Sequence, residues 1–468
     1  MKVLSTTKWG ACTKVLRTFY IAYIRAKIDY GAMIYRSAAE TNLKKLEVIQ
    51  NACLRLILGA WKTTPILSLQ AEAHIPPLAL RNYYITIKTY LKLKYRPIED
   101  DTITTLEINK ADINQPFNSF SKRAVAAVKA IEMDHIKRVP TNNIHIIPPW
   151  KTLEEYVRIE KAYNLRANSE FREYIEENFT GYLEIYTDGS KINNPIESTA
   201  SGMYIPKEKQ AISWRLRKEH SVISAELYAI GQALEYINQY KHGHNCIIFT
   251  DSLSGIQLIK NIPRTYIKVI AKIQALLLQL NENSNVIIHW VKGHAGIIGN
   301  EIADRTANKG HELNKTVLYE LTIDERITTL KDKFKEYWDL YWKESMNISS
   351  KGLFLGSIRD NIQQKIPTYT RNRREEIVLF RLRIGHINLR AHMSRFEIGN
   401  TNLCDTCQTP ETIEHFLLEC NKYQAPRNAM INKLQQMNIT NVTLKTLLGG
   451  SNHNNHIKRH IIKTHSIC

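Results

Sequence analysis

The stretch Tyr182-Leu-Glu-Ile-Tyr-Thr-Asp-Gly-Ser190 decides how the middle of the chain folds. Apolar and polar side chains alternate along it up to Thr187, as they do in a β-strand with one buried face. Four more short strand-like runs follow along the chain: Met203–Ile205, Ala211–Leu216, Ile247–Phe249 and Val286–Trp290. Helical patterns separate the later runs, and strands that alternate with helices pair in parallel. We therefore predict an α/β layer whose later strands are parallel.

Helical periodicity fills the intervals between the later strands and most of the remaining chain. The helices expected in the middle part are Ser224 to about Tyr240, one after Ser254, Tyr266–Leu280 and Asn300–Gly310. Before it, Leu153–Phe179 has a helical pattern, and Ser119–Met133 is the one helix expected within a linker that contains several prolines. The predicted fold is a mixed α/β sheet flanked by helices, with mainly helical N- and C-terminal regions.

Acidic residues stand at the boundaries of these predicted elements. Asp188 ends the first strand and Asp251 ends the fourth. Glu226 lies in the first turn of the helix after the third strand, and Asp304 lies in the helix after the last strand. Sites in open α/β sheets form beyond the carboxyl ends of parallel strands, so we expect these four side chains to converge. Gly189 is expected to let the backbone turn away directly after Asp188.

Converging carboxylates indicate a metal site. Their mutual repulsion costs several kcal/mol unless cations neutralise it. Mg²⁺ suits a site with few protein oxygen ligands, and Mn²⁺ is the alternative ion. Two such ions about 3.5–4 Å apart activate a water and stabilise the leaving oxygen in a displacement at phosphorus. Each acid taken alone is more simply a turn residue or helix cap, but four at element boundaries favour a shared site.

The motifs around these acids resemble those of ribonuclease H. They are Tyr186-Thr-Asp-Gly-Ser-Lys191, Ser224-Ala-Glu-Leu227, Thr250-Asp-Ser252, and His289-Trp-Val-Lys-Gly-His-Ala-Gly-Ile-Ile-Gly-Asn-Glu-Ile-Ala-Asp304. Residues 181–312 contain all of them in the order of the family. Transposases, integrases and resolvases have a similar architecture with a different carboxylate pattern, and the run Asn300–Asp304 favours ribonuclease H.

The resemblance implies a reaction and roles for individual residues. The reaction is metal-dependent hydrolysis of the RNA strand of an RNA–DNA hybrid, which leaves a 5′-phosphate and a 3′-hydroxyl. The implied Mg²⁺ ligands are the four acids Asp188, Glu226, Asp251 and Asp304. His294 matches the family's mobile histidine, which assists proton transfer or product release. A solvated loop histidine is the plain alternative.

Recognition of RNA requires contacts to successive 2′-hydroxyl groups. The candidate contacts are backbone amides near Gly189 and Ser190 and polar groups near Ser224. Only Lys241, Lys260 and Arg264 are basic between Tyr240 and Tyr266, so the basic protrusion of some cellular ribonucleases H is not evident. Affinity for the hybrid is therefore expected to depend on the flanking regions.

A second group of metal-ligating residues lies near the C-terminus. Cys404, Cys407, His415 and Cys420 have the spacing Cys-x2-Cys-x7-His-x4-Cys. Three thiolates and one imidazole can form a tetrahedral structural zinc site. The interval between Cys407 and His415 is longer than in a retroviral zinc knuckle, and the alternative is a set of buried cysteines. Four arginines just upstream are expected to make a basic surface: Arg381, Arg383, Arg390 and Arg395.

Composition predicts a nucleic-acid partner. The 468 residues carry a formal net charge of +19, most of it in residues 1–100 and 313–468. Lys and Arg bind phosphate by displacing condensed counterions. No apolar run approaches the roughly 20 residues that cross a bilayer, and the N-terminus lacks an apolar signal segment. We expect an intracellular, non-secreted protein with reduced cysteines and no membrane contact, in either nucleus or cytoplasm.

The flanks resemble parts of the jockey-like non-LTR retrotransposon polyproteins. Residues 23–77, with Ile28-Asp-Tyr-Gly31 and Leu46–Leu54, resemble the helical segment after their reverse transcriptase, and Arg381–Cys420 resembles their tail. The implied domains are a thumb-like helical region 1–95, a linker with helices 96–180, the ribonuclease H domain 181–312 and a helical region 320–468 with the zinc site. Glu99-Asp100-Asp101 does not fit a polymerase motif, so the chain is read as the C-terminal portion of an element protein, with the polymerase part as a possible partner.

Two functions from different classes remain open on the sequence alone. One is the hybrid-specific endonuclease, and the other is a non-catalytic, nucleic-acid-binding remnant of a retroelement. The intact set of carboxylates favours the enzyme, because a decayed copy would be expected to have lost some of them.

Overall fold

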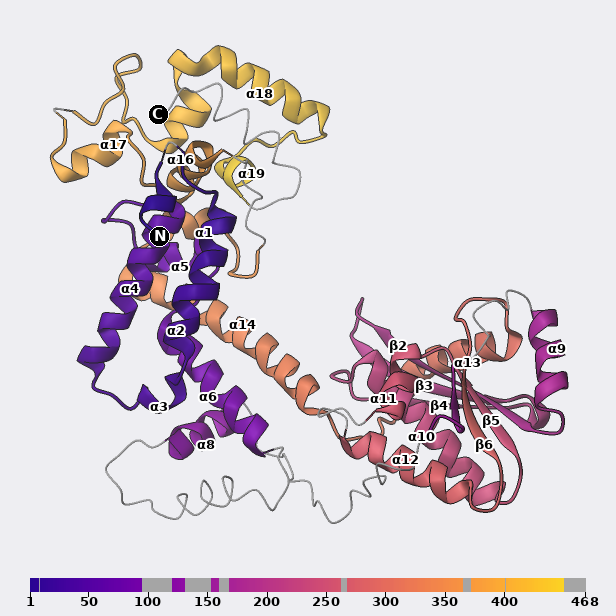
Figure 1. Cartoon of the computed structure of the whole chain (residues 1–468). Helices are drawn as coiled ribbons and strands as arrows, with labels where there is room; N and C mark the ends of the chain where they lie inside the picture. The colour runs from indigo at the N-terminus through magenta and orange to yellow at the C-terminus, as the bar shows by residue number, and fades with distance from the viewer. Residues whose placement is uncertain are drawn as a thin grey trace. The chain divides into compact units, whose positions relative to one another are not determined.

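The computed structural model describes residues 1–7, 9–94, 120–130, 153–159, 168–261, 267–364, 372–399 and 401–449 (Figure 1). The chain divides into two compact units. One, which we call the α/β unit, consists of Leu91–Asn109 and His135–Leu330. The other, the helical unit, combines Met1–Tyr90, Lys110–Asp134 and Lys331–Cys468. Each unit is described by itself below.

A six-stranded sheet with the order β1-β6-β5-β2-β3-β4 forms the centre of the α/β unit. Its strands are β1 (Val157–Arg158), β2 (Leu183–Ile192), β3 (Ser198–Ile205), β4 (Gln210–Leu216), β5 (Cys246–Thr250) and β6 (Val286–Trp290). The first three long strands, β2 to β4, form an antiparallel meander. Strands β5 and β6 join it in parallel, and β1 pairs in parallel with β6. The predicted mixed sheet with parallel later strands is confirmed.

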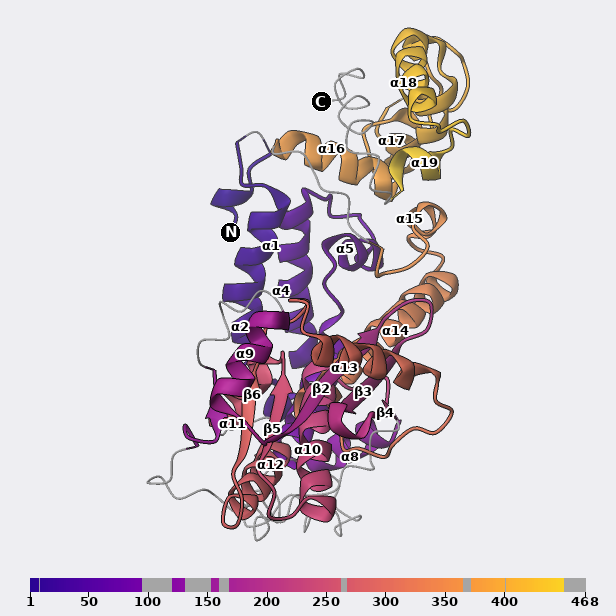
Figure 2. The same cartoon turned by 90° about the vertical axis from the view of Figure 1, so that its right-hand side faces the viewer.

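Helices cover both faces of this sheet (Figures 1 and 2). They are α9 (Asn168–Asn178), α10 (Val222–Tyr240), α11 (Leu253–Lys260), α12 (Ile267–Leu280) and α13 (Ile298–Lys309). Successive strand residues pack on opposite faces of the sheet. Ile248 packs in one core with α10 and α12, and its neighbour Phe249 packs in another with α9 and α13. Because both faces of the sheet are covered, β5 is mainly apolar along its length and all five of its residues are buried.

The prediction of a single helix over Leu153–Phe179 is wrong. Val157 and Arg158 form strand β1, and a helix begins only at Asn168; residues 160–167 lie outside the described part. Val157 is fully buried and pairs with Ile288 of β6. Pairing and burial at the sheet edge therefore outweigh a local helical pattern here, as tertiary context often does.

The predicted linker is described only in part. Phe120–Ala130 forms helix α8, within the predicted helix Ser119–Met133. Residues 95–119 and 131–152, which include Glu99-Asp100-Asp101 and the linker prolines, lie outside the described residues.

Helices make up most of the helical unit, which confirms the predicted helical flanks. Its N-terminal helices are α1 (Thr13–Phe19), α2 (Ala26–Asp29), α3 (Ala32–Tyr35), α4 (Glu40–Leu58), α5 (Ile66–Ala73) and α6 (Leu78–Lys94). Its C-terminal helices are α15 (Leu353–Ile358), α16 (Arg373–Ile384), α17 (Arg390–Met393), α18 (Gln424–Gln436) and α19 (Leu444–Leu448). Helix α14 (Ile323–Ser349) begins in the α/β unit and continues into this one.

A buried ion-pair network joins the N- and C-terminal parts of the helical unit. The carboxylate of Glu72 lies 2.7 Å from Nε of Arg383 and 3.0 Å from Nη1 of Arg359. Burial favours the neutral acid, but the two guanidinium groups hold the pKa of Glu72 at about 2. Removing one partner of such a buried pair typically costs about 3–5 kcal/mol. The network therefore fixes α5 against α16 within one folded unit.

The basic surface predicted from four arginines is therefore wrong for Arg383, which is buried and paired. Arg381 donates to the carbonyl oxygen of Gly59 at 3.0 Å and is half-buried. Arg390 is half-buried and forms a solvent-exposed ion pair with Asp405, whereas Arg395 is exposed. A sequence pattern of alternating arginines does not distinguish a solvated helix face from a set of buried anchors.

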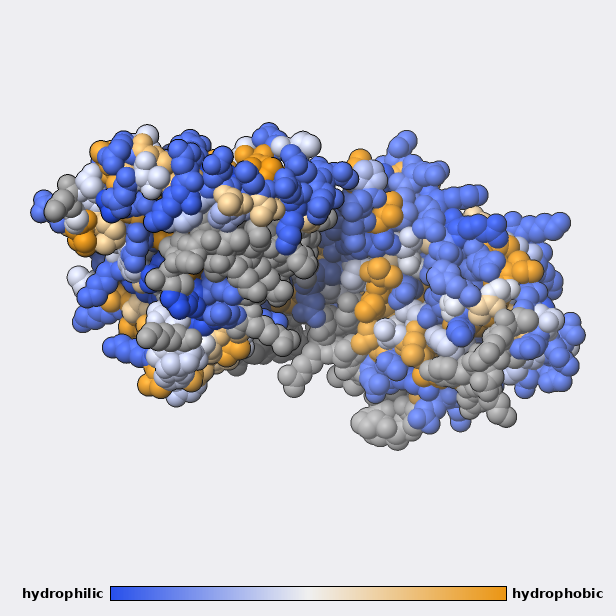
Figure 3. All heavy atoms as spheres, turned by 90° about the horizontal axis from the view of Figure 1, so that it is seen from above, coloured by the Kyte–Doolittle hydropathy of each residue, from blue (hydrophilic) through white to orange (hydrophobic). Residues whose placement is uncertain are grey.

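The visible face of the molecule is mainly hydrophilic, with apolar residues in separate small groups (Figure 3). Within the described ranges, no helix combines the length and the apolar character that a membrane span requires.

Candidate active site and a cysteine–histidine cluster

Three of the four predicted acids meet at one end of the sheet. Each offers a carboxylate oxygen, and these oxygens of Asp188, Glu226 and Asp251 all lie within 4.8 Å of one another. Asp188 lies on β2, Asp251 directly follows the neighbouring strand β5, and Glu226 comes from α10. Parallel pairing of β2 with β5 stops at Thr187 and Thr250, which places the two aspartates side by side just beyond it.

Strand β2 does not end at Asp188, so the turn predicted at Gly189 is wrong. The strand continues to Ile192 because β3 extends beside it, and Gly189 pairs with Ser201. The glycine has a different role. A Cβ atom at Gly189 would lie 2.5 Å from the backbone nitrogen of Glu226. The missing side chain therefore lets α10 approach β2 closely enough to bring Glu226 beside Asp188.

Neighbouring polar groups orient these carboxylates. The hydroxyl of Ser252 donates a hydrogen bond to Glu226. The amide of Asn300 donates to Asp251 at 3.2 Å, and the indole N–H of Trp290 donates to the Asp251 carbonyl at 3.1 Å. Second partners of this kind fix the direction in which metal ligands point.

The electrostatics of the site favour a cation. Burial, then the charge of Asp251, raises the pKa of Asp188 to about 8. Burial and Asp251 also raise the pKa of Glu226. Carboxylates that repel each other in a buried place bind a hard divalent ion through oxygen, so the donor set fits Mg²⁺ or Mn²⁺.

Asp304 stands beside the three converging acids rather than among them. It lies on α13 and accepts a hydrogen bond from the amide of Asn308 at 2.8 Å. Its charge still contributes to the raised pKa of Asp188. Asn308 in turn accepts from the hydroxyl of Ser190 at 2.6 Å, and that hydroxyl lies 3.1 Å from Nε2 of His311. A chain of hydrogen bonds thus links the position of Asp304 to strand β2.

His294 lies in the loop between β6 and α13. Its side chain is exposed, and its backbone has a φ of 53°, in the left-handed region that few side chains adopt. Nearby, Gly296 has a φ of 78°. The loop, which also contains Gly293, presents the imidazole of His294 to solvent.

The residues predicted to contact the substrate differ in exposure. Gly189 and Ser190 are half-buried, whereas Ser224 is only 2% exposed. The backbone N–H of Ser224 donates to the Ser221 hydroxyl at 3.2 Å, and the Ser224 side chain hydrogen-bonds to Glu325. Its hydroxyl is therefore already engaged within the protein.

Sequence reasoning missed Asn308, His220 and Glu325. Asn308 follows Asp304 by four residues, and this helical spacing could have indicated the contact. Nothing in the sequence pairs His220 with Glu325, because the two meet only through the fold.

The C-terminal cysteines and histidine form a compact cluster within the helical unit. One ligand atom from each of Cys404, Cys407, His415 and Cys420 lies within 4.8 Å of the others. The sulfur of Cys420 is 3.7 Å from that of Cys404 and 3.8 Å from that of Cys407. Tetrahedral coordination with Zn–S bonds of about 2.3 Å places sulfurs about 3.8 Å apart, whereas a disulfide needs about 2.05 Å. The sulfur spacing therefore fits zinc.

The contacts around the cluster also suit a metal. Nδ1 of His415 lies 3.2 Å from the Thr409 hydroxyl, and its buried Nε2 has no hydrogen-bond partner among the described residues. Although burial opposes it, hydrogen bonds from the backbone of Cys407 and Thr406 lower the pKa of Cys404. The backbone N–H of Asn421 donates to the Cys407 sulfur at 3.3 Å. Such bonds stabilise thiolates, the form that binds zinc.

Comparison with known proteins matches the RNase H family model to residues 180–312. A ribonuclease H of Orientia tsutsugamushi (strain Boryong) is 33% identical over 142 residues, which cover 27% of this chain and 81% of that protein. The chain belongs to the ribonuclease H family. A ribonuclease H of Pseudomonas entomophila (strain L48) is 32% identical over 139 residues, covering 27% of this chain and 92% of that protein.

Solved structures similar to the ribonuclease H domain have lower identity. LC11-RNase H1, isolated from compost, is 22% identical with a TM-score of 0.23, and the match covers 28% of this chain and 97% of that one. A foamy viral protease-reverse transcriptase in complex with dsDNA is 23% identical with a TM-score of 0.24, covering 28% of this chain and 95% of that one. The family assignment makes the chain an enzyme, a ribonuclease H.

Proposed function

We propose that the chain hydrolyses the RNA strand of RNA–DNA hybrids in a reaction that depends on Mg²⁺, with Mn²⁺ as the alternative. The convergence of Asp188, Glu226 and Asp251 carries this proposal. Together with Asp304 they are proposed to hold two ions, which when bound supply an activated water and a stabilised leaving oxygen. The products are a 5′-phosphate and a 3′-hydroxyl.

The protein's own residues position the hybrid. We assign contacts with 2′-hydroxyl groups to Gly189 and Ser190, which border Asp188 on β2. Ser224 itself is buried, so in the first turn of α10 the proposed contacts belong to the polar groups near it rather than to its own hydroxyl. His294, exposed in its loop, is proposed to assist proton transfer or product release.

We also propose a structural zinc ion in the cluster of Cys404, Cys407, His415 and Cys420. The sulfur spacing and the unpartnered histidine nitrogen support it. Such an ion would stabilise the loops that form the cluster by joining their four ligands at one point.

The resemblance of both flanks supports a retroelement context. We propose residues 181–312 as the catalytic domain of a jockey-like retrotransposon protein, between the helical region 1–95 with its linker 96–180 and the helical region 320–468. The polymerase part of the same element is the proposed partner. The free cysteines among the described residues fit an intracellular, reducing compartment.

A hybrid cleavage assay tests the catalytic proposal. The full chain is incubated with a labelled RNA–DNA hybrid in Mg²⁺ or in EDTA, beside the Asp251→Asn variant. We expect cleavage of the RNA strand only by the parent in Mg²⁺, with hybrid binding largely retained by the variant. Cleavage by Asp251→Asn at the parent rate would remove that carboxylate from the reaction. A parent that binds the hybrid but never cleaves it would leave the binding remnant as the function.

A further inference from the structure

The residues that follow the matched domain stay attached to it. Residues 313–330, which we call the strap, begin beyond the end of the family match at residue 312. Thr316 forms a bridge to Arg215 at the outer edge of the sheet, and the N–H of Val317 donates to the Arg215 carbonyl at 2.8 Å. The guanidinium of Arg215 returns a hydrogen bond to the carbonyl of Leu313, also at 2.8 Å. The strap thus extends the edge of the sheet.

The next residues of the strap pack against α10 through apolar contacts. Val317 and Tyr319 pack against a small core made by Leu216, Ala225 and Tyr228. The ring of Tyr319 lies 4.8 Å from that of Tyr228 in an edge-on arrangement. These contacts anchor the strap beside the start of the helix that carries Glu226.

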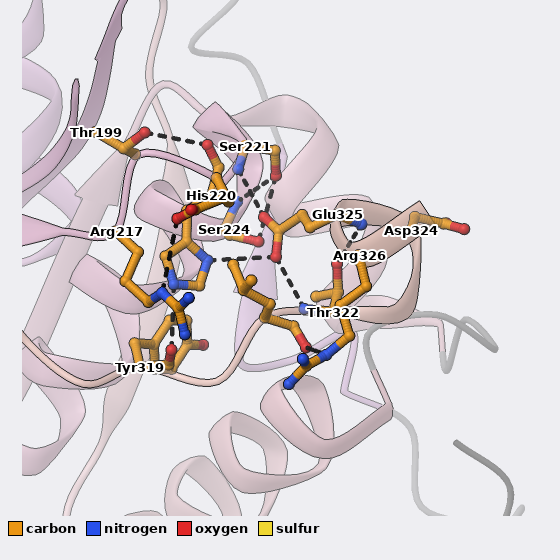
Figure 4. Close-up of polar contacts among 12 residues, drawn as sticks. Thr199, Arg217, His220, Ser221, Ser224, Tyr319, Thr322, Asp324, Glu325 and Arg326 are labelled. Carbon is orange, nitrogen blue, oxygen red and sulfur yellow. Dashed lines mark hydrogen bonds and ion pairs between the residues drawn. The ribbon is translucent and has the colours of Figure 1, made fainter. Parts of the chain in front are cut away.

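Glu325 of the strap binds the N-terminal end of α10 directly (Figure 4). One carboxylate oxygen accepts the backbone N–H of Ser221 at 2.6 Å, and the other accepts that of Thr322 at 2.8 Å. Glu325 also hydrogen-bonds to the side chain of Ser224, and it lies 3.3 Å from Nδ1 of His220. Ser221 is the residue that caps α10, so one carboxylate holds both its cap and its first turn.

His220 is the buried partner of Glu325 at this end of α10. Its Nε2 lies 3.3 Å from the carbonyl oxygen of Tyr319, while its Nδ1 faces Glu325. Each ring nitrogen thus faces an oxygen of the strap, so the imidazole is held from both sides. His220 is fully buried and Glu325 is 5% exposed, so neither group can exchange its partner for water. Burial opposes ionisation of Glu325, but hydrogen bonds from His220 and Ser224 hold its pKa at about 2.

We propose that Glu325 is a positioning residue for ribonuclease H catalysis, because it holds the first turn of α10 and thereby sets the position of Glu226. The proposal rests on the metal-dependent function proposed above. Strand β2 limits movement of the start of α10 on the side of the sheet, because Gly189 lies in close contact with the Glu226 backbone. The catalytic domain would therefore extend to about residue 330. Because the Ser224 hydroxyl is bound by Glu325, Ser224 would act through the position of this turn.

The test compares strap variants of the full chain. Glu325→Gln keeps the shape of the side chain but removes its charge and one acceptor. Glu320→Gln is the matched control. Glu320 lies on the same strap, but its carboxylate is exposed and forms an ion pair, 2.9 Å long, with Lys268 of α12. The readout is the Mg²⁺ concentration that gives half-maximal cleavage of the hybrid, together with kcat and KM at saturating Mg²⁺.

For Glu325→Gln we expect the half-maximal Mg²⁺ concentration to rise at least fivefold while KM for the hybrid changes less than twofold. Glu320→Gln should match the parent. A folded Glu325→Gln with the parental Mg²⁺ dependence would overturn the proposal. An inactive parent would instead overturn the proposed function, so the two failures are distinguishable.

A milder variant covers the case in which Glu325→Gln fails to fold, as judged by circular dichroism. The hydroxyl of Thr322 accepts the backbone N–H of Glu325 at 3.3 Å, so Thr322→Ala loosens the turn that carries Glu325 without removing a buried charge. We expect about a twofold rise in the half-maximal Mg²⁺ concentration. An unchanged value in Thr322→Ala would then reject the role of Glu325.

Discussion

The three acids and the cysteine–histidine cluster each bring ligand atoms within 4.8 Å of one another. The acids are far apart in the sequence, whereas the cysteines and the histidine are close together in it. The acids come from β2, α10 and the end of β5, and the sheet holds them together. The cysteines and histidine all fall within residues 404–420, on loops and one short helical segment. We therefore expect the sheet to hold the acids in place whether or not an ion is bound, and the loops around the cysteines to depend on the proposed zinc ion. Metal removal should therefore affect the two sites in opposite ways.

The largest effect is expected at the acids, where the metal serves chemistry. Asp188→Asn should lower the rate of hybrid cleavage by about 10³-fold, because the remaining acids hold the ions incompletely. The fold should persist, since the sheet does not depend on the ions. Glu301→Gln, an exposed acid on α13, is the matched control and should cleave at the parental rate. Parental activity in Asp188→Asn would show that the acids do not act as one group.

At the cysteines the metal should serve the fold instead. Cys404→Ser should lose the expected zinc, about one ion per chain, and amide exchange in residues 401–423 should become at least about tenfold faster. Hybrid cleavage should change much less. Cys12→Ser, a half-buried free cysteine outside the cluster, is the control. Equal zinc content in Cys404→Ser and the parent would remove the zinc site, and the contrast between the two sites with it.

A smaller effect tests how the sheet brings the acids together. Gly189→Ala introduces a Cβ 2.5 Å from the Glu226 backbone, so α10 must shift and cleavage should fall about tenfold to a hundredfold. Gly231→Ala lies on the same helix, and its nearest neighbour beyond α10 is 3.9 Å away. That control should keep its activity and gain up to about 1 kcal/mol of stability. If both variants cleave alike, close approach at Gly189 is not what positions Glu226.

The smallest effect concerns the stability of the metal-free α/β unit. Burial and Asp251 raise the folded-state pKa of Asp188 to about 8, above the value near 3.9 of an unfolded chain. Between these values the folded state binds more protons than the unfolded state, so stability should fall steadily as the pH rises from about 4 to about 8. Amide exchange of β2 and β5 in EDTA measures this slope. Asp188→Asn and added Mg²⁺ should each flatten it, and an equal slope in the variant would contradict the assignment.

How much the sequence could predict depends on how local each cause is. Asp188, Glu226 and Asp251 stand in motifs that fix their place on the sheet, so their convergence was predictable. The role of Gly189 was not, because it depends on the distance between a strand and a helix that are far apart in sequence. The same holds for β1, which exists through its pairing with β6, and for Arg383, whose partner Glu72 lies 311 residues away. Strand pairing and buried ion pairs are decided by the assembled core, which local periodicity does not record.

The central claim is that Asp188, Glu226 and Asp251 form one divalent-cation site, and a titration with Mn²⁺ tests it most directly. The full chain, first saturated with zinc, is titrated with Mn²⁺ while free Mn²⁺ is followed by electron paramagnetic resonance, in parallel with Asp251→Asn. The account predicts that the parent binds up to two Mn²⁺ ions and that the variant loses at least one of them. Equal Mn²⁺ binding by the parent and Asp251→Asn would contradict it.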